Sequence, residues 1–127
     1  LVHASLFDDL LMQATALLEG GYRLPAAVVA GAALEEHVRL MARATGIPLE
    51  EPHKKTGKMR PREASTLRED LYAQKKVINA GERSQVQAWM DLRNEAAHNK
   101  PEFQSHSDGD VERMIEGVRE FIVRHPA

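Results

Sequence analysis

The chain has 127 residues, of which 43% are hydrophobic and 28% are charged, and its formal net charge is −2. The length suits one domain covering residues 1–127, and the composition is that of a folded globule rather than a disordered segment. Because cysteine is absent, a disulfide scaffold, a thiol nucleophile and a cysteine zinc site are excluded. The slightly negative charge excludes a globally basic nucleic-acid binder.

The chain lacks an apolar run near the roughly 20 residues of a membrane span, and its N-terminus lacks the pattern of a signal peptide. We therefore expect a cytoplasmic protein with no membrane partner. The first residue is Leu rather than Met, so we expect either a processed chain or a domain cut from a longer protein, in which case part of the function lies in the parent protein.

Apolar residues recur at helical spacing, and no stretch shows the strict alternation of a strand. The first predicted helix covers residues 5–19, with Ser5 as its N-cap. The second begins at Pro25 and ends before Gly46. Its first half, residues 26–34, is apolar on every face, which predicts a central helix buried on all sides.

Prolines and glycines mark residues 47–62 as a loop, and a short helical segment is predicted at 63–77, with a break expected near Tyr72. The fourth helix is predicted at 82–99. After a loop at 100–107, the fifth is predicted at 108–124, with Ser107 and Asp110 as a capping box. Short loops favour antiparallel neighbours, so the prediction is an all-α, up-and-down bundle of four long helices plus a short extra helix.

The end of the fourth helix contains Arg93, Asn94 and His98 within six residues. Asn94 and His98 share a helix face, whereas Arg93 lies about 140° around the axis from His98. Arg93 also falls on the apolar stripe, where a charged group needs a partner or a function. One interpretation is structural: Arg93 pairs with Glu35 or Glu36 of the second helix, and His98 merely lies at a helix C-terminus. The other is a functional site.

The loop at residues 53–62 holds five of the 17 Lys and Arg residues and none of the 19 acids, which leaves 12 positive against 19 negative charges, or −7, elsewhere. These five residues are candidate RNA-phosphate contacts: Lys54, Lys55, Lys58, Arg60 and Arg62. The alternative is a solvated, mobile loop.

Motifs for other chemistry are missing. The histidines lack metal-ligand spacing, and neither a phosphate-binding nor a dinucleotide-binding glycine loop is present. We therefore expect no metal and no cofactor. His37 is predicted to be a hydrogen-bonded core residue rather than a ligand.

Taken together, these features resemble a known family. The segment from Arg93-Asn94 to His98 resembles the RNxxxH form of the motif of HEPN domains (higher eukaryotes and prokaryotes nucleotide-binding). The alanine-rich second helix with Leu34-Glu35-Glu36-His37-Val38-Arg39, the lead-in at residues 86–92 and the closing helix around residues 118–122 are similar to helices of that family. The resemblance covers nearly the whole chain.

The resemblance implies a helical bundle that forms a homodimer. Many HEPN members are metal-independent ribonucleases of toxin–antitoxin and other defence systems, whereas others are non-catalytic binding modules. Carried over by position, Arg93 and His98 match the catalytic pair and Asn94 the polar residue after the arginine. Independently of the resemblance, Glu35 or Glu36 would support Arg93 if one of them pairs with it.

Three functions remain open: a dimeric HEPN-type endoribonuclease, a non-catalytic HEPN module that binds RNA, nucleotide or a protein partner, and an unrelated helical interaction domain. A histidine base and an arginine for the developing phosphorane charge suit RNA cleavage without a metal. The sequence identifies neither the RNA target nor any antitoxin or parent-protein domain.

Overall fold

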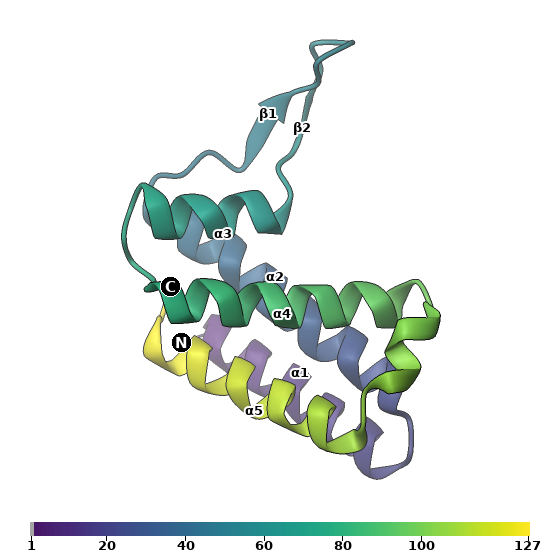
Figure 1. Cartoon of the computed structure of the whole chain (residues 1–127). Helices are drawn as coiled ribbons and strands as arrows, with labels where there is room; N and C mark the ends of the chain where they lie inside the picture. Colours follow the sequence, from purple (N-terminus) through teal and green to yellow (C-terminus); the bar gives the residue numbers. More distant parts are fainter. Residues whose placement is uncertain (1) are drawn as a thin grey trace.

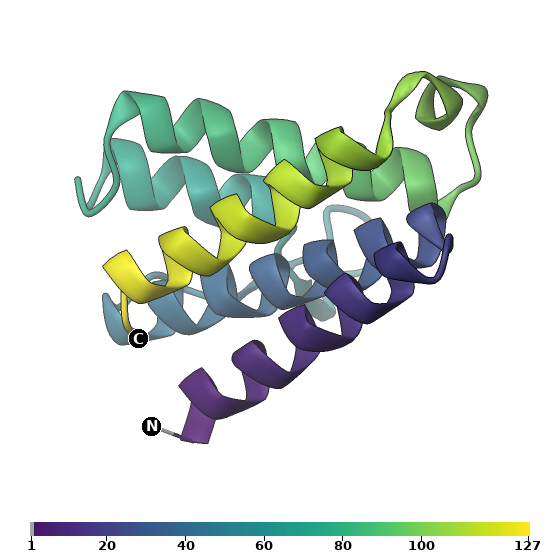
Figure 2. The ribbon, with the colours of Figure 1, turned by 90° about the horizontal axis from the view of Figure 1, so that it is seen from below.

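The computed structural model describes the backbone of residues 2–127 and the side chains from residue 5 onward. Four long helices are α1 (Val2–Glu19), α2 (Arg23–Ala44), α4 (Ala80–Ala97) and α5 (Asp108–Arg124), and the shorter α3 (Ala64–Ala73) precedes α4. Figures 1 and 2 show α1 and α2 as one antiparallel pair and α4 and α5 as a second. The predicted all-α bundle of four long helices plus a short one is confirmed.

Helix α2 is the central element, since it packs against α1, α3, α4 and α5. Its alanines are small enough to let these helices approach closely, and Ala26, Ala30 and Ala33 are fully buried. The prediction of burial on all sides is wrong in one respect, because Ala32 is exposed. The four neighbours surround only part of the helix circumference.

The helix starts follow their capping residues. Asn79 and Glu82 form a capping box at α4, and Ser107 and Asp110 form the predicted one at α5. Each box satisfies backbone N–H groups that have no partner within the helix. The predicted N-cap at Ser5 is wrong, because α1 already begins at Val2 and Ser5 lies inside it.

The segment between α2 and α3 is a β-hairpin, with β1 (Glu50–Pro52) paired antiparallel to β2 (Met59–Pro61). It projects away from the helices (Figure 1). The prediction of a strand-free loop at 47–62 is therefore wrong. Strands of three residues are too short to produce a recognisable alternation. The predicted loop at 100–107 likewise contains a 3₁₀ turn, η1 (Pro101–Ser105). Helix α3 ends at Ala73, next to the break expected near Tyr72.

His37 is buried in the core, with its ring edge-on to Phe7 and Phe121. Its Nε2 lies 2.6 Å from the backbone oxygen of His125, so Nε2 carries the proton and donates it. Its buried Nδ1 has no hydrogen-bond partner in the described part of the chain. Burial lowers the pKa of His37 below its ordinary value of 6.5. The prediction of a hydrogen-bonded core histidine is confirmed.

The core lies where the helices converge and consists mostly of aliphatic side chains with three phenylalanines, Phe7, Phe103 and Phe121. Its largest fully buried members include Phe7, Leu11, Leu34, Leu67, Leu71, Phe103, Met114 and Ile115. Within the part of the chain that the structure describes, the helices are too short or too polar to cross a bilayer.

Candidate functional site

Helix α4 ends directly after the segment that contains Arg93 and Asn94. Asn99 adopts a left-handed backbone with φ of 47°. The N–H of Lys100 donates to the carbonyl of Glu95 at 2.8 Å. This arrangement closes the last turn, and Pro101 cannot continue a helix. His98 is therefore the C-cap of α4 and is exposed at its end.

The stem of Arg93 crosses α2 at Gly31. A Cβ atom built on Gly31 would lie 2.1 Å from Cγ of Arg93 and 2.4 Å from its Cβ. A glycine is thus required for this close approach. Arg93 therefore enters the side of α4 that faces α2, as its place on the apolar stripe predicts.

The Arg93 guanidinium is held by two neighbours. Its Nε lies 3.7 Å from a carboxylate oxygen of Glu35, and its Nη1 donates to the side-chain oxygen of Asn94 at 3.2 Å. Of the two candidate partners, the structure brings Glu35 to Arg93, and Glu36 is exposed, with no ion pair among the described residues. The structural interpretation of Arg93 as an ion-paired residue is thus correct, and it is compatible with a functional one.

The ion pair leaves hydrogen-bonding capacity unused. The 3.7 Å separation is too long for a hydrogen bond, and the buried Nε of Arg93 has no acceptor among the residues that the structure describes. The side chain as a whole is 29% exposed. An anionic oxygen that reached the Nη atoms of this guanidinium would gain a charge-assisted hydrogen bond.

A groove of about 440 Å³ lies beside Arg93, between α2, α3 and α4. Its lining combines carboxylate, cationic and amide groups with the start of α3: Glu35, Arg39, Glu63, Ala64, Ser65, Gln87, Met90, Asn94, His98 and Lys100. We call it the α3–α4 groove. It brings His98 and Asn94 together with Glu35. Arg93 reaches the groove through its contacts with Glu35 and Asn94, and among the described residues it forms no hydrogen bond or ion pair with His98.

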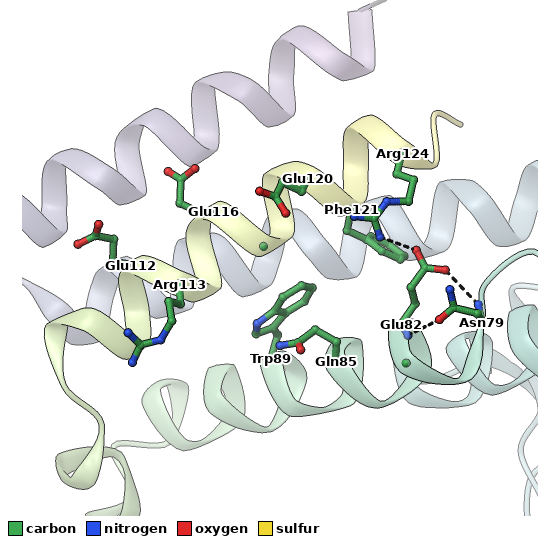
Figure 3. Close-up of a pocket in the computed structure, with 12 residues that line it drawn as sticks. Asn79, Glu82, Gln85, Trp89, Glu112, Arg113, Glu116, Glu120, Phe121 and Arg124 are labelled. Carbon is green, nitrogen blue, oxygen red and sulfur yellow. Dashed lines mark hydrogen bonds and ion pairs between the residues drawn. The ribbon is translucent and has the colours of Figure 1, made fainter.

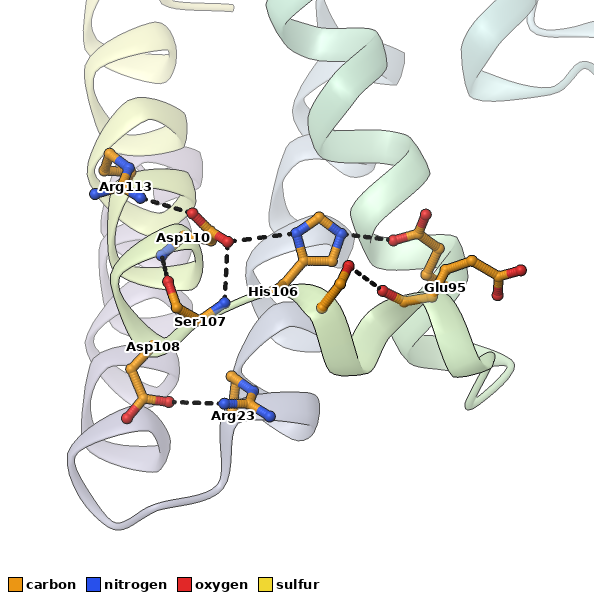
Figure 4. Close-up of polar contacts among 9 residues, drawn as sticks. Arg23, Glu95, His106, Ser107, Asp108, Asp110 and Arg113 are labelled. Carbon is orange, nitrogen blue, oxygen red and sulfur yellow. Dashed lines mark hydrogen bonds and ion pairs between the residues drawn. The ribbon is translucent and has the colours of Figure 1, made fainter.

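The end of α4 is braced against α5 through His106 (Figure 4). Nε2 of His106 lies 2.8 Å from the Glu95 carboxylate, and its Nδ1 lies 3.6 Å from that of Asp110. A hydrogen bond from the backbone N–H of Ser107, aided by Arg113, lowers the pKa of Asp110. Since Glu95 lies between Asn94 and His98, this brace fixes the helix end that presents the candidate site.

The hairpin between β1 and β2 presents three of the predicted RNA-binding residues at its tip. Lys54, Lys55 and Lys58, which we call the tip lysines, are exposed. The turn is organised by His53, whose Nδ1 accepts the backbone N–H groups of Lys55 and Thr56 at 3.1 and 3.3 Å. The tip lysines thus project from a hydrogen-bonded turn.

The other two basic residues of the hairpin have partners. Arg60 lies 3.6 Å from Glu51 across the strand pair. Arg62 is 13% exposed and binds Asp70 of α3 at 2.7 Å and the Pro48 carbonyl at 2.9 Å. Arg62 therefore anchors the base of the hairpin, and its guanidinium is less available to a phosphate than the tip lysines are.

Sequence analysis missed three residues of this region. Gly31 makes room for Arg93, Lys100 lines the α3–α4 groove, and Arg39 lines it while donating to the backbone oxygen of Arg62 at 2.7 Å. Only Gly31 had a signal in the sequence, because a glycine inside a helix often marks a close approach. Arg39 links the groove to the hairpin base, because Arg62, whose backbone oxygen it binds, lies 23 residues further along the chain.

Across the described residues, no three His, Asp or Glu side chains are grouped as metal ligands. No protein-family model, curated protein or solved structure matches the chain.

Proposed function

We propose that the chain is a metal-independent endoribonuclease domain of the HEPN type, with Arg93, Asn94 and His98 as its active residues. The observation that carries the proposal is the Arg93 guanidinium, which is held by Glu35 and Asn94 while its side chain is still 29% exposed. It lies beside the α3–α4 groove, which His98 and Asn94 line.

The chemistry assigned to these residues is transesterification of RNA. His98 takes the proton of the ribose 2′-hydroxyl, whose oxygen attacks the adjacent phosphorus. The P–O5′ bond then breaks and leaves a 2′,3′-cyclic phosphate, while the 5′-oxygen takes up a proton. Arg93 stabilises the negative charge of the phosphorane-like transition state, for which its planar fork is suited. Glu35 and Asn94 position Arg93.

We further propose that a two-fold dimer completes the site. No hydrogen bond or ion pair joins Arg93 to His98 among the described residues of one chain, and both lie near the same end of α4. A two-fold axis near this helix end would bring two Arg93–His98 sets to one cleft. The second histidine would then supply the proton for the leaving 5′-oxygen.

The tip lysines are the proposed contact for the RNA backbone. They are exposed, and the segment that carries them, residues 53–62, contains no acidic residue. Arg39 connects the hairpin base to the α3–α4 groove, which supports one continuous surface for RNA that runs from the hairpin to His98. Phosphate contacts of this kind supply affinity without sequence preference.

The test is cleavage of labelled RNA in EDTA by wild type and by His98→Ala. Loss of a general base is expected to slow cleavage by about 10²–10⁴-fold. The wild-type product should carry a 2′,3′-cyclic phosphate, and free imidazole should partly restore His98→Ala. A folded His98→Ala variant that cleaves at the wild-type rate contradicts the proposal.

Glu35 and Glu36 provide a matched pair of variants. Glu35→Gln should reduce the rate far more than RNA affinity, because Glu35 positions Arg93. Glu36→Gln changes the same charge on the next residue, which is exposed and has no ion pair in the described structure. Equal effects of the two changes on the cleavage rate would mean that the rate depends on overall charge and not on the position of Glu35 beside Arg93.

The second candidate function is a non-catalytic RNA-binding module. The observation that favours it is the exposed set of tip lysines, whose function does not depend on His98. If the protein binds RNA but cleaves none of the RNAs tested, this second function is favoured over the first.

A further inference from the structure

A second groove lies on the other side of α4, between α4 and α5, with a volume of about 630 Å³ (Figure 3). Trp89 projects from α4 across it. A Cβ atom on Gly117 of α5 would lie 2.2 Å from Cζ2 of Trp89, so the indole rests directly on the α5 backbone. Trp89 is half-buried, and together with Phe121 it lines the groove. This α4–α5 groove therefore has an apolar, aromatic floor.

The edge of the groove along α5 is acidic. Glu112, Glu116 and Glu120 are spaced four residues apart, so they form one column on the helix. Figure 3 shows this column on α5, with Trp89 facing α5 from α4. All three glutamates are exposed.

The cationic side chains at the groove already have partners. Arg113 binds Asp110 at 2.6 Å, and Arg124 binds Glu82 at 3.0 Å. By contrast, Glu112 and Glu120 form no ion pair with any residue that the structure describes. The uncompensated charge of the α4–α5 groove is therefore negative, and it lies beside the exposed part of the Trp89 indole.

These features define the chemistry of an occupant. We infer that the α4–α5 groove docks a cationic amphipathic helix of a partner protein. An apolar stripe of that helix would cover Trp89, and its Lys or Arg residues would face Glu112 and Glu120. The gap between two antiparallel helices accommodates a third helix, and an Arg over the indole face would add a cation–π contact.

Other occupants fit less well. RNA is anionic and would be repelled by the glutamate column. A two-fold contact between two copies of this groove would set one glutamate column against the other, because such a contact pairs a surface with itself. The inference does not depend on ribonuclease activity, since the α3–α4 groove lies on a different face of α4.

Trp89 is the only tryptophan of the chain, so its fluorescence reports directly on the groove. The probe is a synthetic amphipathic peptide of about 18 residues, or five helical turns, with a leucine stripe flanked by Lys and Arg. Its titration should shift Trp89 emission with a salt-dependent Kd. A peptide with the same stripe flanked by Glu, and a scrambled cationic peptide, should bind at least about tenfold more weakly.

The variant is Glu112→Gln with Glu120→Gln, and the matched control is Glu36→Gln with Glu102→Gln, which removes two exposed charges elsewhere. The groove variant should bind the cationic peptide roughly three- to tenfold more weakly, and the control should not. Equal binding by the two variants overturns the inference, as does equal binding of the acidic peptide. A change of Trp89 emission on dilution of the protein alone, absent in the groove variant, would identify a second copy of this chain as the occupant and also overturn it.

Discussion

Replacement of Gly31 by alanine tests whether the approach of Arg93 to α2 controls the candidate site. The new Cβ would lie 2.4 Å from Cβ of Arg93, about 1 Å short of the 3.4 Å at which ordinary contacts begin. Rotation of the Arg93 side chain cannot relieve this contact, because its Cβ is fixed to the α4 backbone. Helices α2 and α4 must therefore separate by about 1 Å at this point.

The stability effect is the difference of two terms. Overpacking costs about 1–3 kcal/mol, while alanine in place of glycine inside a helix recovers about 1 kcal/mol. We therefore expect Gly31→Ala to fold, with a free energy of unfolding lowered by about 0–2 kcal/mol. Because 1 Å of misplacement can reduce a catalytic rate by about 10²-fold, RNA cleavage should fall far more than stability does.

Gly117→Ala is the matched control. Its Cβ would lie 2.2 Å from Cζ2 of Trp89, on the opposite side of α4 from the α3–α4 groove. It imposes an overlap of similar length without touching Arg93, although this overlap falls on a ring that can rotate rather than on a Cβ fixed to the backbone. The measurements are urea denaturation, RNA cleavage in EDTA, and the NMR signal of the Arg93 Nε–H, which reports its surroundings even in the absence of activity.

Two results would refute this reasoning. Gly31→Ala with wild-type cleavage and an unchanged Arg93 Nε–H signal would show that the overlap is absorbed elsewhere. Equal loss of cleavage in both glycine variants, in proportion to their loss of stability, would show that Gly31 supports the fold rather than Arg93.

Three further predictions concern other parts of the molecule. Light scattering at micromolar concentration should give about twice the chain mass of 14.2 kDa, and a strict monomer would contradict the proposed composite site. Changing the three tip lysines to alanine should weaken RNA binding and reduce the slope of log K against log salt by roughly 0.7 for each phosphate that is no longer bound, whereas Lys75→Ala with Lys76→Ala should leave that slope unchanged. Stability should fall as the pH drops below 6.5, by at most about 1.4 kcal/mol per pH unit, because burial lowers the pKa of His37 and the unfolded chain then binds a proton that the native core excludes. The stability that neutral His37 contributes is fully present above pH 6.5 and is lost as the pH falls toward the lower pKa of the native state. In urea denaturation, the free energy of unfolding of His37→Gln should therefore depend less on pH.

Local features of the fold could be predicted from the sequence because their causes lie within a few residues. The capping box of Ser107 with Asp110 starts α5 where expected, and Pro101 ends the α4 region. Helical periodicity identified all five helices. Where a local signal failed, as at Ser5, the helix simply continued past a residue that could have capped it.

Interactions between distant residues were decided by packing. The sequence offered Arg93 two partners, Glu35 and Glu36, and only the way α2 and α4 pack at Gly31 selects Glu35. Likewise, the hairpin depends on Arg62 meeting Asp70 of the next helix. Both grooves beside α4 arise from the spacing of whole helices. Each of these features depends on contacts among many residues from different helices, so no short pattern in the chain indicates it.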